Sequence, residues 1–169
     1  MRTAMRQILT MRSPVGPLVL SAEGDSLTAI SFSDQPGVDA PSQDVPSVLV
    51  EAQRQLVAYF AGELQHFDLS LAARGTPFQQ RVWAELANIP YGSTASYGDI
   101  ARRLGMAAGA SRAVGLANGS NPLAIVVPCH RVIGSNGTLT GYAGGLERKR
   151  FLLGLEAAAV PGSLFGPQV

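Results

Sequence analysis

Residues 96–122 read SYGDIARRLGMAAGASRAVGLANGSNP, and they contain two short helical patterns with glycine between them. The first pattern covers residues 96–105 and ends at Gly105. The second covers residues 109–122 and stops at Pro122, because proline cannot continue a helix. Two short helices joined by a glycine-containing turn are typical of a helix-turn-helix, whose second helix enters a DNA groove. Many helical pairs share this pattern, so it needs support from the rest of the chain.

The second of these helices is built from small residues around a single charge, Arg112. Two interpretations stay open. A helix with so bare a surface can pack tightly inside a core. Alternatively, its backbone can press into a DNA minor groove while Arg112 reaches between the bases. The small residues are Gly109, Ala110, Ser111, Ala113, Gly115, Ala117 and Gly119.

A further helix precedes this pair at residues 76–89, TPFQQRVWAELANI, and its apolar residues follow helical spacing. Thr76 can cap this helix while Pro77 occupies its first turn. The preceding segment ARGTP marks a domain boundary. We therefore expect two domains, residues 1–75 and residues 76–169.

The first half has the pattern of a small α/β unit. A helix is predicted at residues 47–64, closed by Gly62, after a polar, proline-rich connection at residues 36–47. His66 has no cysteine or histidine nearby, so a metal site is not expected there. Strand patterns lie at residues 8–11, 18–22, 27–32 and 67–71, with a hairpin turn at residues 23–26.

Composition limits the class of protein. The 169 residues are 46% hydrophobic and 15% charged, which is typical of a globular protein, and no apolar run approaches the ~20 residues that span a membrane. Arginines interrupt the N-terminal stretch, and a single cysteine cannot form an internal disulfide, so we expect a cytoplasmic protein. Residues 1–75 carry five arginines and eight acidic residues, a net charge of −3. Residues 76–169 carry eight basic and four acidic residues, a net charge of +4. This asymmetry favours an anionic partner for the second half, although an ordinary solvated surface is an equal alternative.

The only cysteine, Cys129, stands beside His130 in the stretch VPCHRVI, residues 127–133. A thiolate is a strong nucleophile, and a neighbouring base can generate it near neutral pH. Adjacent residues of a strand point to opposite faces, so the two side chains can cooperate only if the backbone turns or a water bridges them. Pro128 favours such a departure from a strand. Glu156, among leucines in the last helical run, could orient the imidazole. An inert buried cysteine is the commoner alternative.

These residues together resemble a known family. The run PCHRV, preceded by SRAVGLANGSNP and followed by GYAGG and a helix that ends in LLGLE, is similar to the O6-alkylguanine-DNA alkyltransferases. The similarity covers residues 76–157 nearly without gaps, and SPVGPL and YFAGEL extend it more loosely into the first half. It implies an α+β fold. A small N-terminal α/β domain with a ribonuclease H-like sheet and helix would precede a mostly helical C-terminal domain with a winged helix-turn-helix.

The resemblance also implies an activity and a role for each site residue. The protein would flip O6-alkylguanine out of duplex DNA and transfer the alkyl group, once and irreversibly, to Cys129. His130 would take the thiol proton through a water, and Glu156 would hold the imidazole. Tyr97 would protonate the departing guanine, and Asn121 would brace the turn before the active-site segment. Arg112 would fill the vacated stack on a DNA-binding helix that includes Ala110, Ser111, Ala113 and Gly115, and the pocket would include Val127, Pro128, Tyr142 and Ala143.

The resemblance and the residues also indicate what to expect of partners and cofactors. We expect no cofactor, and the zinc site of some relatives has no ligand set here. The resemblance implies that the partner is double-stranded DNA that contains O6-alkylguanine. We expect a monomer in solution, and the sequence leaves cooperative assembly on DNA open. Ala143 and Ala124 stand where certain relatives have serine and proline, so alkyl-size preference is not implied. A Cys-His hydrolase and a non-catalytic damage binder are the alternative classes.

Overall fold

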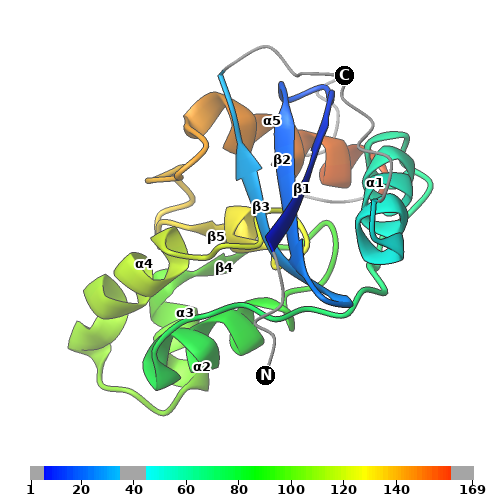
Figure 1. Ribbon diagram of the computed structural model, residues 1–169. Helices are drawn as coiled ribbons and strands as arrows, with labels where there is room; N and C mark the ends of the chain where they lie inside the picture. Colours follow the sequence, from blue (N-terminus) through cyan, green and yellow to red (C-terminus); the bar gives the residue numbers. More distant parts are fainter. Residues whose placement is uncertain (1–5, 35–44, 161–169) are drawn as a thin grey trace. The chain divides into compact units, whose positions relative to one another are not determined.

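The computed structural model describes residues 6–34 and 45–160 of the chain, drawn in Figure 1. The chain divides into two compact units, Met1–Arg74 and Gly75–Val169. Most of the predicted proline-rich connection, residues 36–44, lies outside the described residues. The fold is of the mixed α and β type expected, with a sheet and a helix in the first unit and mainly helices in the second.

The first unit contains a three-stranded antiparallel sheet in the order β1-β2-β3 (Figure 1). The strands are β1 (Arg6–Met11), β2 (Leu18–Glu23) and β3 (Ser26–Phe32). The turn between β2 and β3 is two residues long, and Gly24 adopts a φ of 59°, which glycine tolerates without steric cost. Both predicted hairpin strands are therefore confirmed.

Helix α1 (Ser47–Phe60) packs against this sheet and closes the core of the first unit. Its buried residues recur at helical spacing, and the chain leaves the helix at Gly62 with a φ of 77°. The side chains buried between helix and sheet include Leu18, Leu20, Leu27, Ile30, Leu49, Leu56 and Tyr59.

The strand predicted at residues 67–71 is wrong. Only Leu71 forms an isolated bridge, to Leu27, and the rest of the segment has no strand pairing. A side chain of α1 takes the place of a neighbouring strand, because the Gln55 amide donates to the Asp68 carbonyl at 2.9 Å and accepts from the Asp68 N–H at 2.9 Å. The backbone N–H and carbonyl of Asp68 are thus satisfied without a neighbouring strand.

The second unit begins with α2 (Pro77–Leu86), and its start follows the predicted signal. The Thr76 side chain accepts from the Gln79 N–H at 3.1 Å, and the Gln79 side chain accepts from the Thr76 N–H at 2.9 Å. This reciprocal capping box satisfies two donors that a helix start otherwise leaves unpaired. Trp83 on this helix is buried, and its indole N–H donates to the Ala117 carbonyl at 2.8 Å.

The helix-turn-helix comprises α3 (Tyr97–Arg103) and α4 (Ser111–Gly119). A second capping box, between Ser96 and Asp99, starts α3, and Gly105 has a φ of 71° just after it. The predicted second helix is shorter than expected, because Ala108–Ala110 forms a separate 3₁₀ turn, η1. Only one face of α4 is buried, at Val114, Ala117 and Asn118, so the interpretation of α4 as a fully core-packed helix is wrong.

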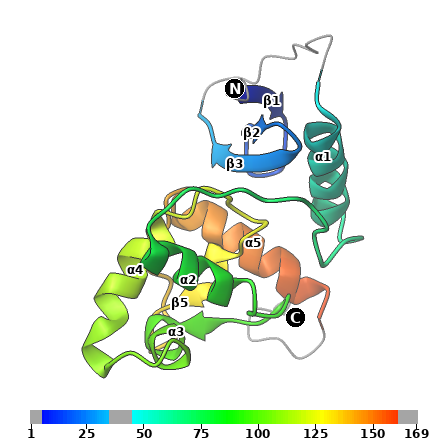
Figure 2. The same cartoon turned by 60° about the horizontal axis from the view of Figure 1, so that its bottom comes forward.

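The rest of the second unit places two distant segments together. The strands β4 (Ala95–Ser96) and β5 (Val132–Ile133) pair in parallel, and the 3₁₀ turn η2 (Cys129–Arg131) leads directly into β5. Figure 1 shows this pair between α5 (Leu146–Ala158) and the helices α2 and α3, and Figure 2 shows β5 beside α2 and α3. The segment around Cys129 is therefore enclosed within the second unit.

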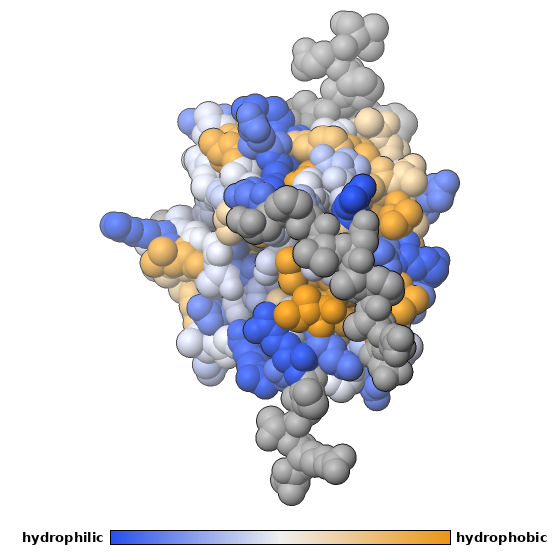
Figure 3. Space-filling view, turned by 45° about the horizontal axis from the view of Figure 1, so that its top comes forward, coloured by the Kyte–Doolittle hydropathy of each residue, from blue (hydrophilic) through white to orange (hydrophobic). Residues whose placement is uncertain are grey.

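Some large apolar side chains are exposed. Figure 3 shows several groups of apolar residues between polar ones on the face that it draws. None of the helices in residues 6–34 and 45–160 is long and apolar enough to cross a membrane. Among the residues that the structure describes, the large apolar ones with 40% or more of their surface exposed are Ile8, Val50, Val57, Leu71, Leu116, Leu146 and Phe151.

Two glycines test how tightly the second unit is packed. A Cβ on Gly75 would overlap the buried ring of Trp83, whereas one on Gly154 in α5 would meet no atom outside its own helix. We expect Gly75→Ala to lower the free energy of unfolding by about 1–3 kcal/mol through overpacking. Gly154→Ala should raise it by about 0.5–1 kcal/mol, since alanine is the better helix former.

Urea unfolding of both variants, followed by the fluorescence of the single tryptophan, measures these changes. Equal stability of the Gly75→Ala variant and the parent would show that the Trp83 ring yields freely, contrary to the packing described.

Candidate active site

Residues 121–129 lead from the end of α4 to the thiol through a series of tight turns. The Asn121 amide donates to the Val127 carbonyl at 2.8 Å, and its oxygen accepts from the Leu123 N–H at 3.0 Å. Ile125 has a φ of 73° and is the central residue of a three-residue turn. The Val126 N–H closes this turn by donating to the Ala124 carbonyl at 2.8 Å. Such a turn is strained for a β-branched residue. The Asn121 side chain therefore stabilises a backbone conformation that is unfavourable by itself.

The backbone at Cys129 and His130 turns, as cooperation between their side chains requires. Both lie in η2, and the Cys129 N–H donates to the Val127 carbonyl at 2.8 Å across Pro128. Cys129 is a free thiol with 6% of its surface exposed, and His130 is fully buried. Neither residue belongs to a strand, so the alternation that would separate their side chains does not apply.

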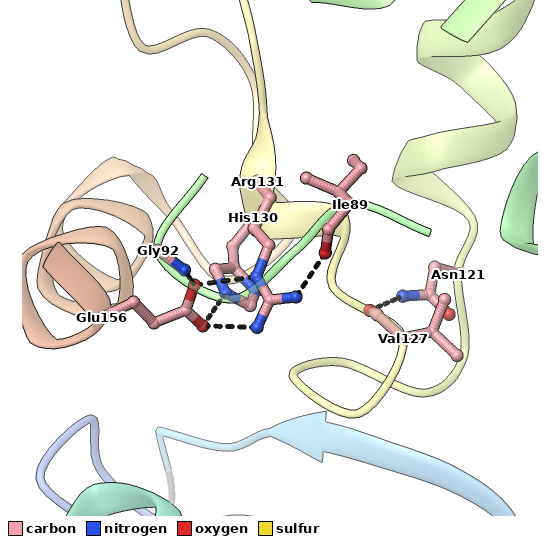
Figure 4. A network of polar contacts seen from close by, with 7 residues as sticks. All are labelled: Ile89, Gly92, Asn121, Val127, His130, Arg131 and Glu156. Carbon is pink, nitrogen blue, oxygen red and sulfur yellow. Dashed lines mark hydrogen bonds and ion pairs between the residues drawn. The ribbon is translucent and has the colours of Figure 1, made fainter. Parts of the chain in front are cut away.

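Glu156 reaches this turn from α5 and pairs with two of its residues (Figure 4). Its Oε2 lies 2.7 Å from His130 Nε2. The Arg131 Nε donates to Oε1 at 2.7 Å, and the Arg131 Nη2 donates to Oε2 at 3.0 Å. A third Arg131 nitrogen donates to the Ile89 carbonyl at 2.7 Å. The carboxylate, which is 1% exposed, thus has two charged or chargeable partners.

The ionisation states of His130 and Glu156 allow the imidazole to act as a base. Burial opposes the charge of Glu156, but His130 and then Arg131 hold the pKa of the carboxyl well below its usual range. Burial lowers the pKa of His130 despite the opposing effect of Glu156, so the imidazole is neutral at pH 7. Because the carboxylate only accepts hydrogen bonds, Nε2 carries the proton. Nδ1 is then unprotonated, and its lone pair has no hydrogen-bond partner among the described residues.

The thiol has an apolar environment with few polar neighbours. Burial raises the pKa of Cys129, while Asn121, Tyr142 and the charge of Lys149 act in the opposite direction. Burial and the neighbouring Cys129 also raise the pKa of the Tyr142 hydroxyl, which stays protonated at pH 7. A resting thiol in this place needs help to ionise, which the neutral imidazole one residue away can supply.

The structure places two further residues, Arg131 and Lys149, at the site, and the sequence analysis does not predict them. Arg131 forms the bidentate contact to Glu156 and also stacks over Tyr91, with its guanidinium carbon 5.6 Å from the ring centroid. Lys149 is fully buried on α5. Arg131 lies inside the quoted PCHRV motif, which was the available signal, whereas nothing in the local pattern distinguishes Lys149 from the arginines beside it.

The helix α4 contacts the turn of the thiol, because the Asn118 side-chain amide donates to the Cys129 carbonyl at 3.4 Å, and Tyr97 belongs to the same unit. Tyr97 starts α3, and a Cβ placed on Gly115 of α4 would lie 3.7 Å from its ring. The Tyr97 hydroxyl accepts from Thr140 Oγ1 at 3.2 Å. Arg112 and Ala113 are exposed, whereas Ser111 and Gly115 are half-buried. The face of α4 that carries Arg112 is therefore open to a partner.

The predicted pocket residues differ in exposure. Val127 and Pro128 are buried beside the thiol, Tyr142 is half-buried and Ala143 is exposed. Ala110 lies in η1, before α4 begins. His66 is exposed, and no group of three acidic, cysteine or histidine side chains within residues 6–34 and 45–160 is arranged to hold a metal ion.

The second unit thus combines a helix-turn-helix with a thiol beside an imidazole and a carboxylate, the site of a protein that reacts through cysteine. Residues 77–158 match the family model of the 6-O-methylguanine DNA methyltransferase DNA binding domain, and residues 8–73 match that of its ribonuclease-like domain. The chain belongs to this family, whose members reverse alkylation of DNA directly by transferring the alkyl group to a cysteine.

Individual relatives are similar over nearly their whole length. The methylated-DNA–protein-cysteine methyltransferase of Mycobacterium bovis is 55% identical over 158 residues, which are 92% of this chain and 94% of that protein. The enzyme of that name from Methanosarcina acetivorans is 52% identical over 149 residues, or 86% of this chain and 95% of that protein. The chain is also similar to the crystal structure of Mycobacterium tuberculosis O6-methylguanine methyltransferase, with a TM-score of 0.82, 53% identity, and coverage of 95% and 98% of the two chains. A structure of the Mycobacterium tuberculosis protein in complex with DNA has a TM-score of 0.80 and 53% identity, with coverage of 92% and 96%.

The buried carboxylate allows a test of stability. We expect Glu156→Gln to lower the free energy of unfolding by about 3–5 kcal/mol, because it leaves the buried Arg131 guanidinium without its charge partner. Glu147→Gln is the matched control. It removes one carboxylate from the exposed first turn of the same helix and should change stability by less than about 0.5 kcal/mol.

The pH dependence of the same measurement follows from the lowered pKa of Glu156. A group with a depressed folded pKa stabilises the fold above its unfolded pKa, about 4.3, and loses that contribution as the pH falls toward the folded value. The difference between parent and Glu156→Gln should therefore be full at pH 7 and shrink in acid. A difference that is constant from pH 7 to pH 3 would contradict the ionised state of Glu156.

Proposed function

We propose that this protein repairs O6-alkylguanine in duplex DNA by accepting the alkyl group on Cys129, once per molecule. The observation that carries the proposal is the buried thiol beside a neutral imidazole, within a unit that matches the DNA binding domain of the family. The product is a thioether, which water does not hydrolyse, and the chain has no second thiol. Each molecule should therefore react only once.

The proposed transfer balances as follows. A water that links the thiol to His130 Nδ1 passes the proton of Cys129 to the imidazole, and Glu156 stabilises the imidazolium that forms. The sulfur then attacks the alkyl carbon, so that an S–C bond forms while the bond from that carbon to O6 breaks. The departing guanine takes a proton from the Tyr97 hydroxyl, and the thiol proton finally restores the tyrosine. The half-exposed position of Tyr97 and its hydrogen bond to Thr140 support this role.

The proposed DNA contact is made by α4. The target atom lies within a stacked duplex, so the nucleotide must be extruded and the stack compensated, at a cost of ~a few kcal/mol. Arg112 is exposed at the start of α4, where a long cation can enter the vacated space. Small residues beside it, at Ala110, Ser111, Ala113 and Gly115, allow the backbone to approach the minor groove closely.

Further proposals concern the pocket and the segment that leads to the thiol. Val127, Pro128, Tyr142 and Ala143 would surround the flipped base. The first two are buried beside the thiol, and the neighbouring Cys129 raises the pKa of the Tyr142 hydroxyl in addition to burial. Asn121 would hold the active-site segment in place through its contact with the Val127 carbonyl.

The division of labour between the parts of the chain is also a proposal. Residues 76–169 would bind DNA and accept the alkyl group, and residues 1–75 would have a structural role. Because the thiol, imidazole and carboxylate all come from one chain, we propose a monomer in the cytoplasm, where thiols stay reduced. Assembly of several molecules along one duplex is a separate hypothesis, which sedimentation of DNA complexes at rising protein concentration checks.

Intact-mass spectrometry after incubation with a duplex that contains O6-methylguanine tests the transfer. We expect a gain of one methyl group on Cys129, with an amount of guanine formed equal to the amount of protein. Cys129→Ser should bind the duplex with similar affinity and gain no mass. Product in excess of protein would indicate a hydrolase instead, and binding without mass gain by the parent would indicate a damage binder.

Arg112→Ala tests the stack-filling role. We expect the variant to keep its melting temperature and to react at least about tenfold more slowly with alkylguanine in a duplex, because nothing then occupies the vacated stack. Its reaction with the free alkylated base should be nearly unchanged. Arg150→Ala, which removes an exposed arginine of α5, is the control for net charge. Equal slowing on both substrates, with a lowered melting temperature, would instead make Arg112 a structural residue.

A further inference from the structure

Lys149 is the only lysine in a chain that carries twelve arginines, and it is fully buried. Lysine is among the residues least often buried, since its ammonium loses hydration unless a partner compensates. All the other cationic positions use arginine, whose charge is far harder to remove. The placement of the one titratable ammonium inside the second unit calls for a physical explanation.

The contacts of Lys149 connect the two sides of the site. Its Nζ donates to the Val132 carbonyl at 2.6 Å and to the Thr140 carbonyl at 2.7 Å. Val132 follows η2 directly, three positions after the thiol. Thr140 precedes the segment of Tyr142 and donates its hydroxyl hydrogen to Tyr97. One ammonium therefore links the strand that follows Cys129 to the segment that contains Tyr142 and is hydrogen-bonded to Tyr97.

No carboxylate pairs with this ammonium in the described part of the chain. The nearby Glu156 is already engaged by His130 and Arg131. Two carbonyl dipoles satisfy two donors of Lys149 but do not neutralise its charge. The group that can provide an opposite charge is Cys129 once it ionises.

The electrostatics of the two groups agree with this geometry. Burial lowers the pKa of Lys149 to about 8, and Cys129 is the group that opposes the decrease. Reciprocally, Lys149 is the charged side chain that lowers the pKa of Cys129 against the effect of burial. The other groups around the thiol are neutral, namely the Tyr142 hydroxyl, the Asn121 amide and the His130 imidazole, and Arg131 is paired with Glu156.

We propose that Lys149 is a positioning residue for alkyl transfer, whose buried ammonium is the counter-charge of the Cys129 thiolate and whose two hydrogen bonds hold Thr140, and through it Tyr97, in place. This inference rests on the proposed function and deepens it. Alkylation converts the thiol to a thioether that cannot ionise, so in the alkylated protein residue 129 can no longer provide the counter-charge of Lys149.

A single lysine makes the inference directly measurable. In protein labelled only at lysine with ¹³Cε, one NMR signal reports the titration of Lys149 in the folded chain. We expect its pKa to be about one unit lower in Cys129→Ser than in the parent, because serine has no thiolate. Parent protein methylated by an O6-methylguanine duplex should show the same decrease. Identical pKa values in all three forms would overturn the proposal.

Thiol reactivity supplies a second readout that does not depend on alkyl transfer. In Lys149→Met, which keeps the length of the side chain, carbamidomethylation of Cys129 by iodoacetamide should be about tenfold slower at pH 7 and should approach the parental rate at high pH, since the pKa of Cys129 rises. Arg150→Met, its exposed neighbour, should behave as the parent. A uniform loss of rate at every pH, with an unchanged midpoint, would make Lys149 only structural.

The two experiments also separate the inference from the proposed function. If Lys149 titrates differently in Cys129→Ser while the duplex adds no methyl group to the parent, the charge pair stands and the alkyl-transfer function fails. If methylation proceeds while the Lys149 titration is the same in every form, the function stands and the positioning role is lost.

Discussion

A carboxylate that is 1% exposed in a protein interior must be fully paired, and Glu156 meets this requirement with two residues of a single 3₁₀ turn. His130 and Arg131 both bind Glu156 of α5, and these contacts fix the orientation of the turn. The orientation of Cys129, the residue before them in the same turn, is fixed as well. Arg131 also reaches the Ile89 carbonyl beyond the end of α2. One buried carboxylate and its partners thus hold α5, the turn of Cys129 and the segment after α2 together. These contacts determine the position of the thiol.

The approach to the thiol is held against its own conformational preference. Ile125 occupies a region of φ that costs a β-branched residue about 1–3 kcal/mol. The residue is buried, and Asn121 spans the segment with hydrogen bonds at both ends. The energy of packing and of these bonds offsets the strain, and in return the chain passes from an exposed helix end to a buried thiol within a few residues.

The second unit buries its thiol but leaves one face of the neighbouring helix α4 exposed. The thiol, the imidazole and the carboxylate are buried, where charges interact strongly because water is excluded. Arg112 lies on the exposed face of α4, where a long side chain is free to enter another molecule. Tyr97 is linked to both regions: its ring lies near Gly115 of α4, and its hydroxyl accepts from Thr140, whose carbonyl accepts from the buried Lys149.

Local signals alone determined much of this protein: the capped start of α2 at Thr76, the end of α1 at Gly62 and the β2–β3 hairpin all depend on residues that are neighbours in the chain. The resemblance carried by PCHRV and its flanks identified the family. The sequence did not reveal that Asp68, within the strand predicted at residues 67–71, would pair with the Gln55 side chain instead of a strand. Nor did it reveal the contact of Arg131 with Glu156, 25 positions away. Only the tertiary structure decides which partner satisfies a buried polar group, because that choice depends on which distant segments the packing of apolar faces has already brought together.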